Sequence, residues 1–429
     1  MSRTHQSTSN PTLKSKTLYL TTMASAALRL NPRLHHHRLL LSRLYSATIP
    51  PQPDLAPPSS HSQSQSQSRL KTAIRHESDP DRLASLFLSA GSDRSFHGDR
   101  QIYSYTIRRL ASSRRTDLID SLLSSSLSSF PSPSEGFLIR IISLYSQSGM
   151  VDHAVRTFNQ IKSVTDRSFS ALLSAYFDNK MFDQLHKAFN TLPIELGFSP
   201  GVASYNVFLK CLCSEGKLVT ARAVLGEMPK KGLEPDIISY NEVLNGYLKK
   251  GDEPGFNEFL KLVYQREFRP NATTYNLRIR LLCNKGRSFE AEELVDYMIL
   301  NKIYPNLLTF NTIIDGFCKE GKVSSAMRVF KRMKEVMLVD CTGMTPNFET
   351  YSLLIKGLVE NQLFLPAVEV CKECAEKKWA PPFQAVRKLV DGLLDISRKE
   401  AEEVVWNVRK VVKGDAANEW KKIEASFSF

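Results

Sequence analysis

The chain has 429 residues, of which 42% are hydrophobic and 24% charged, a composition typical of a protein that folds around a core. No apolar run approaches the roughly eighteen residues that a membrane-spanning helix needs, so no membrane partner is expected. The net charge of +13 is uneven: residues 1–53 carry seven Lys or Arg and no acid, whereas the remainder has 50 basic and 44 acidic residues. Charge alone therefore gives mild support to a nucleic-acid partner.

The acid-free start is typical of an organellar transit peptide, with arginines among leucines, alanines and serines. The stretch from Arg43 to Ser46 resembles a mitochondrial processing site, so we expect residues 1–45 to be a mitochondrial transit peptide, with translation starting at Met1 or Met23. The alternative is a basic N-terminus without a targeting role. The three histidines at 35–37 lie inside this segment and do not predict a metal site.

Residues 46–68 are rich in proline and then in serine and glutamine, which predicts a disordered linker. From Leu70 onward the apolar residues follow a helical period, and no segment shows sustained β-type alternation. We expect degenerate helical repeats over residues 69–165, because "LYSQSGMVDHAVRTF" keeps part of the pattern that follows.

An internal repeat of 35 residues dominates the rest of the chain. An aromatic residue followed by asparagine recurs at this spacing, as Tyr205–Asn206, Tyr240–Asn241, Tyr275–Asn276 and Phe310–Asn311. The units run over residues 202–236, 237–271, 272–306, 307–347 and 348–382, after a weaker unit at 166–201, and the fourth carries six extra residues. We therefore predict a repeat array over residues 166–382.

Each unit has the periodicity of a helical hairpin. In unit 202–236, Tyr205, Phe208, Leu209, Leu212 and Cys213 form one apolar stripe, and a glycine then breaks the helix. A second amphipathic helix follows and ends at a C-cap glycine. Such a hairpin buries its stripes only by stacking on its neighbours, so the predicted fold is an all-α solenoid with a continuous core. Residues 383–429 read as a C-terminal helical cap.

The sequence offers no catalytic or cofactor-binding pattern. Cys213, Cys283 and Cys318 occupy equivalent places in their units and read as small buried hydrophobes. The pair Cys371 and Cys374 lacks the second pair or the histidine that a zinc site needs, and no histidine follows His186. Aspartates after the array are scattered, and no phosphate-binding glycine pattern occurs. We expect no enzyme, no metal, no cofactor and no small-molecule substrate.

The unit "VASYNVFLKCLCSEGKLVTARAVLGEMPKKGLEPD" resembles the pentatricopeptide repeat in its plain form, the P-class. This resemblance implies a right-handed α-solenoid of stacked helical hairpins that binds RNA on its concave face, about one base per repeat. In that family, the residue after the aromatic and the last residue of the unit together select the base. The pairs are Asn206 with Asp236, Asn241 with Asn271, Asn276 with Asn306, and Asn311 with Asn347. The resemblance implies that the first pair favours uracil and the others cytosine.

The asparagines lie about 100° around the helix from the aromatic, off the apolar stripe, so packing does not explain their return. Helix capping is the alternative explanation. Lys249 and Lys319 fit the family's place for a lysine that faces the RNA backbone; solvated surface charge is the alternative. The pairs Ser170/Gly201 and Ser352/Pro382 depart from productive pairs, and Ile139 cannot hydrogen-bond a base.

The chain resembles short plant mitochondrial members of this family, several of which associate with the small ribosomal subunit. We therefore expect a protein of the mitochondrial matrix that binds single-stranded mRNA or ribosomal RNA and supports translation as a ribosome-associated component. Proteins of the mitochondrial small ribosomal subunit are its expected neighbours. A free factor that stabilises, processes or activates one transcript is the first alternative, and a protein-only scaffold is the second.

Overall fold

The computed structural model describes residues 61–90, 96, 98–129, 132–266, 268–339 and 345–427. Residues 1–60, which include the predicted transit peptide and most of the predicted linker, lie outside them. The chain divides into two units, Met1–Arg69 and Leu70–Phe429, and the helical stack belongs to the second. Among the described residues all regular structure is helical, and no helix is long and apolar enough to cross a membrane.

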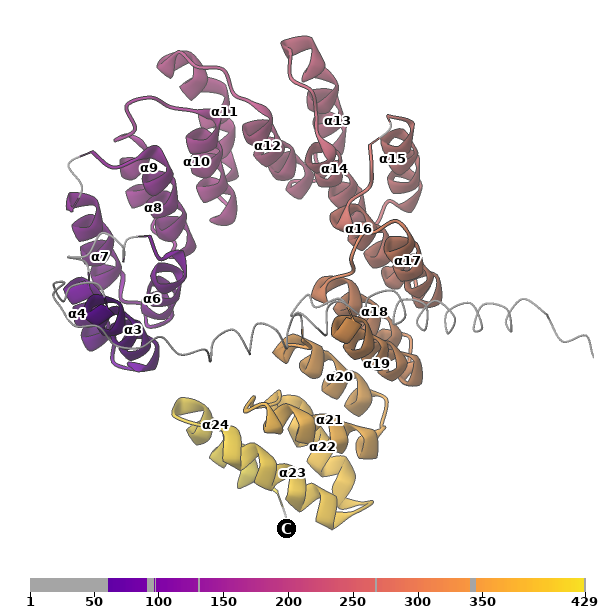
Figure 1. Cartoon of the computed structure of the whole chain (residues 1–429). Coiled ribbons are helices and arrows are strands. Elements are labelled where there is room, and N and C mark those ends of the chain that lie inside the picture. The colour runs from indigo at the N-terminus through magenta and orange to yellow at the C-terminus, as the bar shows by residue number, and fades with distance from the viewer. Residues whose placement is uncertain are drawn as a thin grey trace, which may run out of the picture. The chain divides into compact units, whose positions relative to one another are not determined.

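The helices follow one another as hairpins in chain order (Figure 1). The first helices of the hairpins are α6 (Arg100–Ser112), α8 (Glu135–Gln147), α10 (Asp166–Asp178), α12 (Val202–Ser214), α14 (Ile237–Lys250), α16 (Ala272–Asn284), α18 (Leu307–Lys319), α20 (Phe348–Glu360) and α22 (Phe383–Leu394). The second helices are α7 (Thr116–Ser128), α9 (Val151–Phe158), α11 (Phe182–Leu196), α13 (Leu218–Glu227), α15 (Glu253–Gln265), α17 (Ser288–Leu300), α19 (Val323–Val339), α21 (Phe364–Glu376) and α23 (Arg398–Val411).

The remaining elements flank or connect these hairpins. They are α3 (His61–His76), α4 (Pro80–Ala90), a 3₁₀ turn (Pro229–Lys231) and α24 (Asp415–Glu424). Each first helix from α6 to α22 contacts the next first helix along the chain, and each second helix contacts the first helix of its own hairpin. Side-by-side hairpins of this kind form an α-solenoid, which confirms the predicted fold class.

Glycines end the first helices where the sequence predicted a break. Gly216, Gly251, Gly286 and Gly321 have φ between 70° and 78°, a left-handed conformation that glycine adopts without strain. Gly232, with φ of 75°, closes the turn after α13 in the same way. In these four units a glycine turn therefore ends the first helix.

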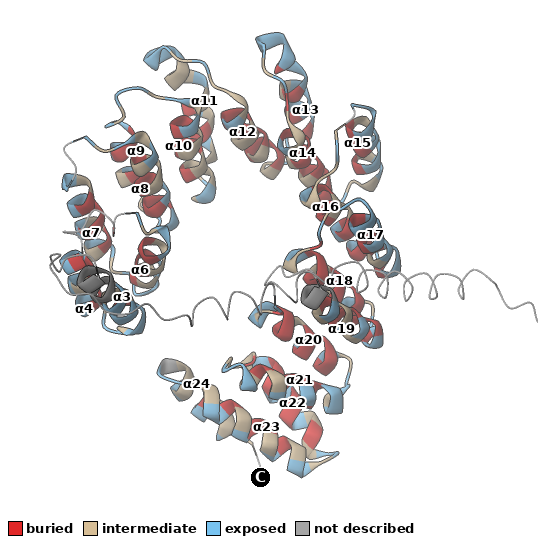
Figure 2. Cartoon of the chain, viewed as in Figure 1, coloured by how far each residue is buried: buried red, intermediate tan, exposed pale blue. Residues whose placement is uncertain are grey.

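The core lies between the packed helices, where buried residues face one another (Figure 2). It consists of two buried clusters, and both include residues of α16. At three junctions a glycine of the first helix, Gly246, Gly316 or Gly357, lies so close to the preceding unit that an added Cβ would meet a cysteine within 2.8 Å. Leu281 occupies this place in α16, so α16 cannot approach α14 as closely.

Part of the segment predicted as a linker is helical in the structure. Helix α3 begins at His61, inside the segment predicted as a disordered linker. Glutamine has a good helix propensity, and the serine–glutamine run leads without proline or glycine into a segment whose Ile74 is fully buried.

Candidate RNA interface

The last residue of each regular unit starts the next hairpin. Asp236, Asn271, Asn306 and Asn347, which we call the cap residues, are the N-caps of α14, α16, α18 and α20. The side-chain Oδ1 of each accepts the backbone N–H of the third residue of the helix, and the hydroxyl of that residue accepts the N–H of the cap residue. These capping boxes fix the position of each cap side chain.

A side chain of the preceding unit joins each box. Nδ2 of Asn241 donates to Oδ1 of Asn271 at 3.1 Å, and Oδ1 of Asn241 accepts from Oγ1 of Thr274 at 2.9 Å. The asparagine after the aromatic, the cap residue and the hydroxyl residue thus form one hydrogen-bonded group, which we call the reading module. It spans two consecutive repeats and locks their first helices together.

The same module recurs along the array. The hydroxyl-to-asparagine distance is 2.6 Å for Ser239 and Asn206, 2.7 Å for Thr309 and Asn276, and 2.8 Å for Thr350 and Asn311. The asparagine-to-cap distance is 3.2 Å for Asn206 and Asp236, and 3.3 Å for Asn276 and Asn306. Asn311 and Asn347 share no such bond among the described residues, and the six extra residues of the fourth unit lie between them.

The structure corrects the argument that packing does not explain the asparagines. Asn241, Asn276 and Asn311 are buried, with exposures of 4%, 8% and 4%, against the next first helix. Helix capping does not explain them either, because the cap residues perform that role. Inter-repeat hydrogen bonding accounts for their return, and any base contact comes in addition to it.

Each cap side chain keeps one polar atom outside the module. Since Oδ1 is bound by the helix terminus, the remaining atom is Oδ2 in Asp236 and Nδ2 in Asn271, Asn306 and Asn347. These atoms have no hydrogen-bond partner within the described part of the chain, and the four side chains are only half buried. The array therefore displays one acceptor and three donors at repeat spacing.

Exposed apolar residues lie beside the modules, which the sequence reasoning missed. Ile238 and Leu308 are 49% and 60% exposed, although each stands on the first turn of a first helix, three residues before Asn241 and Asn311. Residues three apart share a helix face. The sequence signal for this surface is a large aliphatic residue at a solvent-facing helix position, three residues before the asparagine of a module.

The reading module is absent from the unit before Asn206. Asp166, at the start of α10, accepts N–H bonds from Gly201, Ala203 and Ser204 at 2.8, 3.1 and 3.2 Å, so it caps α12 from the preceding repeat. A Cβ on Gly201 would lie 2.6 Å from Oδ2 of Asp166, so a side chain at the cap position would have to displace this carboxylate. A carboxylate of the neighbouring repeat has replaced the cap residue.

The series of reading modules also ends after Thr350. In the next unit, Ser352 stands in the asparagine place, and its buried hydroxyl has no partner in the described structure. Pro382 stands in the cap place and makes no side-chain cap bond. The pattern is therefore complete for the first three predicted pairs, and it lacks only the asparagine-to-cap bond in the pair Asn311 and Asn347.

The two candidate backbone lysines differ in their surroundings. Both are exposed at the end of a first helix. Nζ of Lys249 donates to the neutral hydroxyl of Ser214 at 3.1 Å, whereas Nζ of Lys319 pairs with Asp315 at 2.6 Å within its own helix. Of these two lysines, only Lys319 is in an ion pair, so Lys249 is the better candidate for a phosphate contact.

The cysteines at equivalent places behave as core residues. Cys213, Cys283 and Cys318 are buried, and burial raises the pKa of the Cys213 thiol to about 12 and that of Cys283 to about 11. Cys371 and Cys374 are buried in α21. Among the described residues, neither these two nor Asp391 and Asp395 take part in a group of three potential metal ligands.

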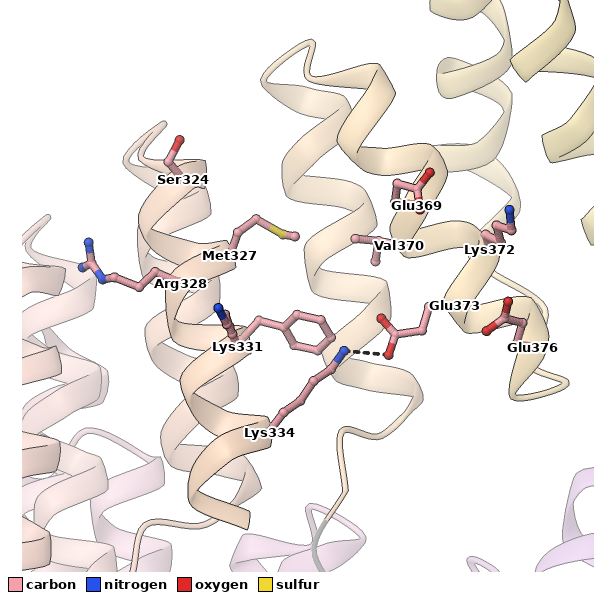
Figure 3. A pocket seen from close by; sticks show the side chains of 11 residues that line it. Ser324, Met327, Arg328, Lys331, Lys334, Glu369, Val370, Lys372, Glu373 and Glu376 are labelled. Carbon is pink, nitrogen blue, oxygen red and sulfur yellow. Dashed lines mark hydrogen bonds and ion pairs between the residues drawn. The ribbon is translucent and has the colours of Figure 1, made fainter. Parts of the chain in front are cut away.

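A groove lies on the second helices, away from the modules. It has a volume of about 740 Å³ between α19 and α21, and Lys334 of α19 reaches across it to Glu373 at 2.6 Å (Figure 3). Met327 and Val370 line it, together with further lysines and glutamates. Helix α19 is the longest of the second helices, with 17 residues, because the insertion extends it. None of the predicted site residues lines this groove.

Four segments of the chain match known repeat models. Residues 200–252 match the model described as "PPR repeat family", and residues 140–164, 273–303 and 301–334 match models described as "PPR repeat". These segments are pentatricopeptide repeats. The matched segments contain the first and third reading modules, Asn241 and Thr274 of the second, and most of the fourth unit, so these hydrogen-bonded groups lie mostly within pentatricopeptide repeats of this chain.

Similar curated proteins come from Arabidopsis thaliana. The small ribosomal subunit protein mS78 (rPPR3a) is 34% identical over 171 residues, which are 39% of this pentatricopeptide-repeat chain and 43% of that protein. The small ribosomal subunit protein mS79 (rPPR3b) is 35% identical over 170 residues, 38% of this chain and 43% of that protein. The chain thus spans about two fifths of the length of the curated relatives it matches.

Solved pentatricopeptide-repeat structures are also similar to this chain. The crystal structure of PPR10 from maize matches with 19% sequence identity and a TM-score of 0.41, covering 84% of this chain and 61% of that chain.

Proposed function

We propose that this protein binds RNA in mitochondria and supports translation as a component associated with the small ribosomal subunit. We further propose that it acts by binding and not by catalysis. The observation that carries the RNA-binding part is the reading module, which holds one unpaired polar atom at the same place in each of four consecutive repeats.

The exposed atoms match the edges of pyrimidines. Uracil presents an N3–H donor, which the free Oδ2 of Asp236 accepts. Cytosine presents N3 as an acceptor, and a free Nδ2 of Asn271, Asn306 or Asn347 donates to it. The modules therefore favour a U-C-C-C order. The cap bonds support this, since they fix which atom of each side chain is left exposed.

The exposed aliphatic side chains complete the surface for a base. Ile238 and Leu308 lie on the same helix face as Asn241 and Asn311. A base whose edge meets the cap residue places its flat face against such a side chain, where burial of apolar area contributes at about 25 cal/mol per Å². One turn of helix thus supplies both the polar group that selects the base and the apolar side chain that contacts its face.

The small number of modules favours a ribosomal role. Four bases specify roughly one site in 256, because mismatch costs arise only where a base is read. A factor that selects one transcript must read more bases than four. A ribosomal component needs fewer, because its neighbours in the ribosome also bind it. The relatives named as small ribosomal subunit proteins and the arginine-rich, acid-free start support this assignment and a mitochondrial, matrix location.

Sedimentation of a mitochondrial lysate through sucrose tests the proposal. The protein should co-migrate with the small ribosomal subunit at constant stoichiometry and resist high salt, and it should shift when magnesium chelation opens the ribosome. Migration in light, RNase-sensitive particles would contradict the ribosomal role and favour a free transcript factor. Migration in an RNase-resistant particle without ribosomal RNA would indicate a protein-only scaffold.

A further inference from the structure

A histidine, a cysteine and a carboxylate meet where α11 packs against α12. Nε2 of His186 lies 2.6 Å from Oε2 of Glu215, and Sγ of Cys211 lies 4.0 Å from Nε2 of His186 and 3.6 Å from Oε2 of Glu215. It is the one group of at least three potential metal ligands within the described residues, with all three ligand atoms inside 4.8 Å of one another. The reading modules do not use it.

The repeat pattern does not require these residues. The place of Cys211 is filled by Gly246, Gly316 and Gly357 in three later units, where glycine lets neighbouring first helices approach. Arg222 stands in the next unit at the place of His186. The group is therefore specific to the junction between the unit that lacks a reading module and the first unit that has one.

The chemistry and spacing of the three atoms suit a zinc ion. Imidazole nitrogen, thiolate sulfur and carboxylate oxygen are the ligands that Zn²⁺ takes, and tetrahedral bonds of about 2.0 to 2.3 Å place such atoms about 3.3 to 3.6 Å apart. The two distances to Cys211 are already within about 0.5 Å of these values, and the His186–Glu215 pair must open by about 0.7 Å.

We propose that His186, Cys211 and Glu215 bind one Zn²⁺ ion across the α11/α12 junction, with a water as the fourth ligand. His186 binds through Nε2 in its neutral form, and Glu215 binds through Oε2 while Oε1 keeps its 2.8 Å pair with Lys217. Burial and the neighbouring Glu215 raise the pKa of the Cys211 thiol to about 12, so zinc must displace the thiol proton, which leaves to solvent.

The bound metal would crosslink two consecutive repeats. His186 belongs to the second helix of one unit, whereas Cys211 belongs to the first helix of the next, and Glu215 is the C-cap residue of that helix. A metal held by both units fixes α12, whose C-terminal half and C-cap carry Cys211 and Glu215 and whose N-terminal half carries Asn206, the first reading residue. Metal binding would thereby hold the start of the reading array in place.

Cobalt substitution in the full chain tests the site. Co²⁺ bound through Cys211 gives a sulfur-to-cobalt charge-transfer band, which the histidine run at residues 35–37 cannot produce because it has no sulfur. We expect the band to saturate at one equivalent of Co²⁺ per chain and to disappear when one equivalent of Zn²⁺ displaces the cobalt. Cys211→Ser should abolish the band, whereas Cys213→Ser, two residues along the same helix and equally buried, should retain it.

A second variant protects the test against misfolding of Cys211→Ser. His186→Gln keeps a side-chain amide that can donate to Glu215 but removes the imidazole, so it should weaken zinc binding at least tenfold while the circular dichroism melt without metal stays unchanged. Absence of the band in the parent chain, or full retention of zinc affinity in His186→Gln or Cys211→Ser, would overturn the proposal.

Discussion

Oδ1 of Asn241 accepts a hydrogen bond from Oγ1 of Thr274 at 2.9 Å, although 33 residues separate them and they belong to different repeats. The bond is buried, and Thr274 also forms the capping box that fixes Asn271. A residue predicted to read a base is thus part of the interface that joins two repeats. If a substitution of Asn241 abolished RNA binding, the cause could be the lost base contact or the lost inter-repeat bond. The structural role therefore needs its own test.

Thr274→Val tests the structural role without removing a base-reading atom. The substitution leaves Oδ1 of Asn241 buried without its donor and opens the capping box, so unfolding free energy should fall by about 1 to 3 kcal/mol in a urea titration. Thr273→Val, on the exposed side of the same turn, is the matched control and should change little. Equal stabilities of the two variants would contradict the inter-repeat bond.

Asp166→Ala tests the cap supplied by the preceding repeat. The N-terminus of α12 would lose the carboxylate that accepts from Gly201, Ala203 and Ser204, at a cost of about 1 to 2 kcal/mol. Asp183→Ala, which removes an exposed carboxylate in the first turn of α11, is the comparison. Thermal melts of both variants should show the larger loss for Asp166→Ala, and the reverse order would refute the assignment.

Lys249 and Lys319 should contribute unequally to RNA binding. If Lys249 contacts a phosphate, Lys249→Ala should reduce the slope of log affinity against log salt by about 0.7. Lys319→Ala should reduce it by less, because Asp315 already pairs with Lys319. Fluorescence anisotropy over a salt series with a pyrimidine oligonucleotide measures both slopes. Identical slopes in both variants and the parent would assign these lysines to solvent.

Glu242 should make stability depend on pH. Burial raises the pKa of this carboxyl, against the opposing charges of Lys210 and Lys249. Stability is therefore fully present below the unfolded pKa of about 4.3 and is lost as pH rises through the higher folded pKa. Glu242→Gln should raise the melting temperature at pH 7 and have little effect near pH 4.

Glu234→Gln, at an exposed place, is the control for Glu242→Gln and should change the melting temperature little at either pH. A Glu242→Gln variant that is less stable than the parent at pH 7 would show that the carboxylate is favourable in the folded state.

The repeat period and the apolar stripes were sufficient to predict the hairpins, the glycine turns and the buried cysteines, since these depend on residues close in sequence. The role of Asn241 was not predictable in this way, because its partner Thr274 is identified only once two repeats are stacked. The capping of α12 by Asp166, in place of a side chain at Gly201, also depends on an interaction between residues 35 apart in sequence.

The central claim is that the exposed atom of the cap residue selects the base, and a reciprocal exchange tests it most directly. Asp236→Asn turns the exposed acceptor into a donor, and Asn271→Asp does the opposite; both residues cap helices well, so the fold should survive. Anisotropy at fixed salt should show that the double variant prefers C-U-C-C over U-C-C-C RNA by at least tenfold, reversing the parent's order. An unchanged order of preference in a folded double variant would contradict base reading by these residues.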